Sequence, residues 1–171
     1  FTACPNLKAV TLSSKVTNID GVFTGCVRIE TITVPAENQN FIAENGVIYN
    51  KDKTAVRFVY APADGGEDGF FKDGNVVIAA GTMQISDGAF AGREDITSVY
   101  IPKEVTVLGE NAFKGCVNLQ TVVFEEGSAL TEIERWTFQD CRSLRSVVLP
   151  KGIETIGEGA FIGCTSLQSV D

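Results

Sequence analysis

The feature that most constrains this sequence is a repeated unit of 22 to 25 residues that begins at a phenylalanine. A cysteine stands three residues after the phenylalanine in most units, and Arg93 takes that place in one of them. The units begin at Phe1, Phe23, Phe90, Phe113, Phe138 and Phe161, and the cysteines are Cys4, Cys26, Cys116, Cys141 and Cys164. A period of roughly 20 to 50 residues is typical of a solenoid, because one short unit cannot bury its own apolar face and must stack on its neighbours.

Within each unit, apolar residues recur at fixed distances from the phenylalanine. The sixth and ninth residues after it are Leu, Ile or Val in every unit, and the eleventh is apolar wherever the unit reaches it. This alternation is the two-residue period of a short strand. A proline follows at Pro35, Pro102 and Pro150, where we expect the strand to end because proline has no N–H for the sheet. The Ala-Phe-x-Gly segment predicts a single helical or 3₁₀ turn, ended by a glycine that tolerates a left-handed backbone.

Residues 36–75 interrupt the repeat. Two β-prone runs within 47–60 flank a polar turn, which is the pattern of a β-hairpin. A Gly- and Asp-rich stretch at 64–69 predicts a loop, and the repeat frame resumes at Val76. One later unit has two additional residues, which we place in the turn 125–128.

These motifs resemble the BspA-like leucine-rich repeats of bacterial surface and secreted proteins, over 1–35 and about 76–171, with a familiar hairpin-like element at 41–56. The resemblance implies a leucine-rich-repeat solenoid of the β-rich α/β type, a right-handed superhelix. Short parallel strands would form one face and short helical or 3₁₀ turns the other, with a β-hairpin-like insertion. We therefore predict one solenoid domain over 1–171, with repeats at 1–35 and 76–171 and the insertion and loop at 36–75. Because no capping unit is visible at either end, we expect a fragment of a longer array.

The composition excludes several classes of function. The 171 residues include no histidine, which removes the commonest general base and metal ligand together with Ser-His-Asp triads and His-based zinc sites. The net charge is −8 and the 14 basic residues form no cluster, which argues against nucleic-acid binding. No apolar run reaches the roughly 20 residues of a membrane-spanning helix. We predict no enzymatic activity, no nucleic-acid partner and no membrane insertion of this segment.

The cysteines are candidates for a nucleophile, a metal ligand or a disulfide. A reactive thiolate needs a lowered pKa and a general base, and the usual base, histidine, is missing. Stacked coils would place Cys116, Cys141 and Cys164 about 5 Å apart in a column, a spacing that would also allow a disulfide. We expect a ladder of buried thiols that act as small hydrophobic side chains.

Two groups of acidic residues are further candidates. The loop from Asp64 to Asp73 has the oxygen ligands that calcium favours, without the spacing of an EF-hand or of the nine-residue calcium repeat. Four glutamates have the residue type that glycosidases use in pairs. These are Glu125, Glu126, Glu132 and Glu134, all in turns of one unit. We expect solvated turns in both cases, with no metal ion and no cofactor.

The outward positions of the strands are the best place for a binding site. In a stacked sheet, the tenth-position residues form an apolar row and the eighth-position residues form a row of hydroxyls beside it. The candidate partner-binding strand face consists of Val77, Ser98, Tyr100, Thr121, Val123, Ser146 and Val148. An exposed apolar row with a polar rim is typical of a protein-binding surface. Thr and Val are also good strand formers, so the same residues fit a purely structural role.

Trp136 is the only tryptophan and stands two residues before Phe138, on or near the turn. Two roles fit this position. The indole packs against the neighbouring coil, which we favour, or it anchors a partner.

We expect a non-enzymatic module that binds another macromolecule through its solenoid surface. The resemblance implies the location and the partner: the cell surface or the extracellular space of a bacterium, with a protein or another extracellular macromolecule bound, including adhesion to host proteins. One alternative is a structural spacer, or stalk, that presents another domain. A more remote alternative is a carbohydrate-binding or hydrolytic module that uses the acidic loops.

Overall fold

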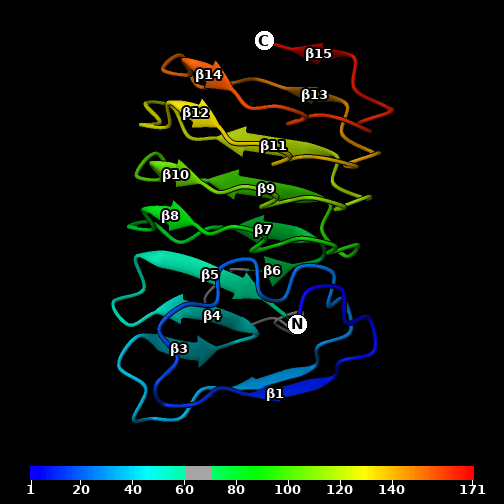
Figure 1. The fold of residues 1–171 in the computed structure, drawn as a ribbon. Coiled ribbons are helices and arrows are strands. Elements are labelled where there is room, and N and C mark those ends of the chain that lie inside the picture. The colour runs from blue at the N-terminus through cyan, green and yellow to red at the C-terminus, as the bar shows by residue number, and fades with distance from the viewer. Residues whose placement is uncertain (61–70) are drawn as a thin grey trace.

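The computed structural model describes residues 1–60 and 71–171. Short strands stack coil upon coil along one axis, so the chain forms a β-solenoid (Figure 1). Two ladders of strands lie side by side along this axis, and the apolar side chains of each coil are buried between them.

The first ladder is a six-stranded sheet built from the strands that the alternation predicts. Its order is β15 (Ser169–Val170), β13 (Ser146–Val147), β11 (Thr121–Phe124), β9 (Ser98–Ile101), β7 (Asn75–Val77) and β6 (Phe71–Lys72). All neighbours pair in parallel except β6 and β7. Val122 lies opposite both Val99 and Val147, and all three are buried. Equivalent positions of successive units are therefore in register, which confirms the predicted parallel strands.

The second ladder contains the insertion. Its five-stranded sheet has the order β10 (Val107–Leu108), β8 (Gln84–Ile85), β5 (Ala55–Val59), β4 (Val47–Asn50) and β3 (Phe41–Glu44). β12 (Glu132–Ile133) pairs with β14 (Thr155–Ile156) further along, and β1 (Ala9–Thr11) pairs with β2 (Thr31–Thr33) near the N-terminus. β4 and β5 are antiparallel, as the hairpin pattern predicts, and β5 then joins β8 in parallel. The insertion thereby becomes part of the solenoid wall.

A column of phenylalanine rings runs through the stacked coils. Phe113 lies between Phe90 and Phe138, with ring centroids 4.8 Å and 5.6 Å away and ring planes within 13° of parallel. Phe23 is stacked against Phe1 on one side and contacts Phe58 of β5 on the other, at 6.0 Å and 5.0 Å. The insertion therefore contributes a ring of its own beside Phe23.

Each buried cysteine completes the hydrogen bonding of a phenylalanine carbonyl in the preceding coil. The Cys116 thiol donates to the carbonyl of Phe90 at 3.1 Å, and the Cys141 thiol donates to that of Phe113 at 3.2 Å. Cys26 and Cys164 make the same bond. The carbonyls of Phe90, Phe113 and Phe138 also accept a backbone N–H within their own turns, so the thiol is a second donor that links two coils as well as a small apolar side chain.

The predicted helical or 3₁₀ turns are not present among the described residues, where this side of each coil consists of hydrogen-bonded turns. Two residues in each turn, two positions before and two after the phenylalanine, have a positive φ. These pairs are Gly21 and Gly25, Gly88 and Gly92, Asn111 and Gly115, Trp136 and Asp140, and Gly159 and Gly163. In each turn, two left-handed residues four positions apart prevent a right-handed helix from continuing beyond that turn.

Two polar side chains fasten the insertion to the coils around it. Asn38 is fully buried, and its amide donates to the carbonyls of Ser13 and Val16. Arg57 of β5 donates to the carboxylate of Asp20, at 3.1 Å and 3.2 Å, and to the Ser86 hydroxyl. These contacts join the coils before the insertion to those after it.

The phenylalanine column predicts a large loss of stability when one inner ring is removed. Phe113→Ala should lower the free energy of unfolding by about 3–5 kcal/mol, because the ring is fully buried and its removal leaves a cavity between two coils. Urea unfolding followed by circular dichroism measures this change. Phe1→Ala is the control, since Phe1 is 64% exposed and should cost less than about 1 kcal/mol. Equal effects of the two substitutions would contradict the proposed role of the column.

Candidate functional site

The outward face of the six-stranded sheet carries the residues singled out in the sequence. The pairing places Val77 opposite Tyr100 and Tyr100 opposite Val123, while Thr121 lies opposite both Ser98 and Ser146. Val77, Val123 and Val148 are 47%, 44% and 69% exposed. The face therefore presents an exposed apolar row along the stack, with hydroxyl groups beside it.

Part of this face is hollowed. A cavity of about 650 Å³ lies over β11 and β13, where Val123 and Val148 form part of its apolar lining and Thr121 and Ser146 line it from the hydroxyl row. The turn 125–128, where the sequence places two additional residues, closes one side. Ser128 N–H donates to the carbonyl of Glu125 across this turn, at 3.1 Å. The longer unit thus forms a wall beside the exposed valines.

Tyr100 and Glu125 border the same face. Glu125 accepts a hydrogen bond from the Lys103 backbone N–H at 3.1 Å and forms an ion pair with the Lys103 ammonium at 3.7 Å. Burial, together with the nearby carboxylates of Glu125 and Glu104, raises the pKa of the Tyr100 hydroxyl above its usual value. Tyr100 therefore stays protonated at neutral pH, with its hydroxyl hydrogen-bonded to the Glu125 carboxylate beside the apolar row.

The four glutamates do not surround one cavity. Glu125 and Glu126 line the hollow over β11 and β13, whereas Glu132 and Glu134 belong to the second ladder, in and directly after β12. Burial and the carboxylates of Glu132, Glu110 and Asp87 raise the pKa of Glu134. The four carboxylates are therefore divided between the two ladders and are not gathered around one cleft.

Among the described residues, no group of three or more His, Cys, Asp and Glu side chains has the arrangement of a metal site. The calcium-loop candidate, Asp64 to Asp73, falls mostly on residues 61–70, which lie outside the described part of the chain.

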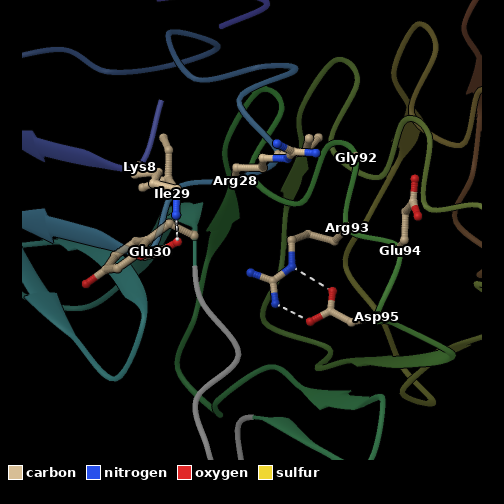
Figure 2. Close-up of a pocket in the computed structure, with 10 residues that line it drawn as sticks. Lys8, Arg28, Ile29, Glu30, Gly92, Arg93, Glu94 and Asp95 are labelled. Atoms are coloured by element: carbon tan, nitrogen blue, oxygen red, sulfur yellow. Dashed lines mark hydrogen bonds and ion pairs between the residues drawn. The ribbon is translucent and has the colours of Figure 1, made fainter. Parts of the chain in front are cut away.

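A second cavity, of about 880 Å³, lies between the turn 27–30 and the turn 92–95 (Figure 2). Arg93, which replaces the repeated cysteine, forms two hydrogen bonds with Asp95, at 2.8 Å and 2.5 Å. Lys8 and Glu30 line the cavity as well. Side chains of both charges are mixed here, so the lining favours neither a cation nor an anion. In the sequence, Arg93 is evident only as the residue that replaces a repeated cysteine. The cavity beside it could not be predicted, because the distance between the turns 27–30 and 92–95 depends on how the insertion packs.

Trp136 packs against the neighbouring coil, as favoured from the sequence. A Cβ placed on Gly159 would lie 2.7 Å from the indole Cδ1, so the ring covers the space that this glycine leaves open. The indole is only partly buried. Its backbone has a φ of 56°, which is unusual for a bulky residue.

All five cysteines are free thiols. Cys26, Cys116 and Cys141 are buried, while Cys4 and Cys164 are partly exposed. Burial raises the pKa of the Cys116 thiol to about 12, and burial also raises the pKa of Cys141 and Cys164. The geometry supports the expected ladder of unreactive thiols.

Comparison with known proteins identifies the repeat. The sequence profile of the BspA type Leucine rich repeat region matches residues 1–52 and 75–171, in six copies. No curated protein sequence matches the chain.

Three crystal structures of bacterial proteins show the fold. A leucine-rich repeat protein from Eubacterium ventriosum is 26% identical with a TM-score of 0.69, over 95% of this chain and 48% of that one. The pneumococcal vaccine antigen PcpA is 20% identical with a TM-score of 0.79, over 96% of this chain and 38% of that one. A leucine rich cell surface protein from Faecalibacterium prausnitzii is 22% identical with a TM-score of 0.66, over 98% of this chain and 60% of that one. The chain thus spans less than two thirds of each of these proteins.

In the part of the chain that the structure describes, no helix has the length and apolar character needed to cross a membrane.

The burial of Cys116 predicts resistance to alkylation. With a pKa of about 12, the folded thiol is ionised in only about one molecule in 10⁴ at about pH 8, so iodoacetamide should leave it unmodified. The partly exposed Cys4 serves as the reactive reference in the same sample, and peptide mass spectrometry separates the two. All five thiols should react after unfolding in urea. Alkylation of Cys116 in the folded protein as fast as that of Cys4 would show that the thiol is accessible.

Proposed function

We propose that this chain, which belongs to the BspA-type leucine-rich repeat family, is a non-enzymatic module that binds another macromolecule through the outward face of its six-stranded sheet. The observation that carries this proposal is the hollow of about 650 Å³ over β11 and β13, which exposes Val123 and Val148 beside hydroxyl groups. Covering an exposed valine yields roughly 1.5–3 kcal/mol, and the hydroxyl row supplies hydrogen bonds that select the partner.

The proposed location is the bacterial cell surface or the extracellular space, and the proposed partner is a host protein or another extracellular macromolecule. The Faecalibacterium relative in fold is described as a cell surface protein, and the pneumococcal one as a vaccine antigen, which supports an exposed location. Adhesion to host matrix proteins is the specific role that we propose.

Introducing a positive charge into the apolar row tests this surface. Val123→Lys and Tyr100→Lys should each weaken capture by purified extracellular matrix proteins at least about tenfold, because a charged lysine must lose its hydration when the partner covers the row. Surface plasmon resonance against a panel of immobilised matrix proteins measures the change. Val107→Lys is the matched control, since Val107 is 42% exposed against 44% for Val123 but belongs to the second ladder.

The outcome separates binding from the spacer alternative. If the strand-face variants Val123→Lys and Tyr100→Lys capture matrix proteins as well as the control Val107→Lys does, the strand face is not the binding site. A wild-type chain that captures no matrix protein would favour a structural spacer, which tolerates any of these substitutions.

A further inference from the structure

A third cavity, of about 440 Å³, lies away from the strand face, on the edge formed by the turns. Its lining comes from the turns of several coils and includes Thr24, Asp87, Glu110, Lys114 and Trp136. We call this cavity the turn-edge groove. Its residues do not take part in the strand face, so it is a separate surface of the molecule.

Glycines let the turns beside the groove approach one another closely. Gly21 and Gly88 occupy the same position of their units as Trp136, two residues before the phenylalanine. A Cβ on Gly88 would lie only 2.5 Å from the Thr24 hydroxyl oxygen, and Gly21 lines the groove with no side chain. The Gly21 N–H donates to the Asp87 carbonyl at 3.0 Å, which holds the coils before and after the insertion together at this point. The turns before and after the insertion are therefore held close together beside the groove.

Trp136 occupies the position two residues before the phenylalanine, where several other units carry glycine. Gly21, Gly88 and Gly159 have the same positive φ, and a left-handed residue with a side chain costs roughly 1–2 kcal/mol relative to the ordinary conformation. Three other units carry glycine at this position, so their coils stack without an aromatic ring there. Trp136 nevertheless places a partly exposed π-surface in the lining of the groove.

Two carboxylates line the groove from neighbouring turns. The Asp87 carboxylate accepts a hydrogen bond from the backbone N–H of Glu110 at 3.0 Å, which fixes its position. Burial raises the pKa of Asp87, and the carboxylates of Asp20 and Glu110 raise it further. Asp20 is paired with Arg57, and Lys114 adds one positive charge to the lining. The carboxylates repel one another, so a cation placed between them would be stabilised.

We propose that the turn-edge groove binds an arginine side chain presented by a partner protein, with the guanidinium held by Asp87 and Glu110 and its flat face against the indole of Trp136. A guanidinium combines the two properties that the lining requires, a delocalised positive charge and a planar surface that stacks on aromatic rings. A sugar would stack on the indole as well, but it would leave the repulsion between the carboxylates unchanged. The charge of the groove therefore favours the arginine.

The single tryptophan gives a direct readout, because all indole fluorescence comes from this groove. Titration with a blocked tri-arginine peptide should change the emission of Trp136 in a saturable way, and the affinity should fall as salt is raised. A blocked tri-citrulline peptide, which has nearly the same shape without the charge, should produce no saturable change. An equal response to both peptides, or no response to tri-arginine, would overturn the proposal.

Variants of the lining separate specific binding from general attraction to an acidic protein. Glu110→Gln should weaken tri-arginine binding at least about threefold, and Lys114→Ala should strengthen it, because the first removes an attractive charge and the second a repulsive one. Glu154→Gln, an exposed carboxylate outside the groove, is the matched control and should leave the affinity unchanged. Equal weakening by Glu110→Gln and Glu154→Gln would show non-specific attraction and would contradict the site.

Trp136→Gly separates binding from folding. Glycine suits the left-handed backbone at this position but loses the contact of the indole with Gly159, so circular dichroism is used first to show that the variant is folded. Isothermal titration calorimetry should then show loss of tri-arginine binding. Unchanged binding by this variant, or emission that responds to chitotriose and not to tri-arginine, would refute the arginine site, and the second result would indicate a glycan site.

Discussion

The rest of the structure depends on the stacking of successive coils, in which each residue lies against the equivalent residue of the next coil. The rings of Phe90, Phe113, Phe138 and Phe161 lie in one column, 4.8 to 5.6 Å apart. A unit of about 23 residues is too short to bury its apolar side chains alone, so each inner ring is buried only when further coils stack on both sides of it. The cysteine thiols reinforce the same contact, because each donates a hydrogen bond to a phenylalanine carbonyl one coil away.

The insertion is accommodated because β5 satisfies the same stacking requirement. Phe58 packs against Phe23 in one apolar cluster, while Val56 and Val59 belong to the cluster of the later coils. The strand ladder is nevertheless interrupted, since β1 and β2 form a separate sheet. The cavity around Arg93 and the turn-edge groove lie beside this junction, because turns from before and after the insertion meet there.

In-register stacking also turns single positions of the repeat into continuous surfaces. The tenth position becomes the apolar row of the proposed strand face, and the hydroxyls of the eighth position lie beside it. Distinctive chemistry arises where one unit departs from the pattern: the longer turn 125–128 makes a wall of the hollow, and Trp136 stands where three other units carry glycine. The two proposed binding surfaces therefore use irregular units on a regular frame.

The repeat period and the alternation of apolar residues determined the solenoid, its short strands and their inward residues, because the position of a residue in the unit fixes its neighbours in adjacent coils. The family resemblance implied that these strands are parallel. It also determined which seven residues share the strand face. Only the tertiary structure decided that the turns are not helical, since paired left-handed residues such as Asn111 and Gly115 are not evident from apolar spacing. The hollow over β11 and the grouping of Thr24, Asp87 and Trp136 were likewise decided by packing, because they depend on how a 40-residue insertion and one longer turn fill space between coils.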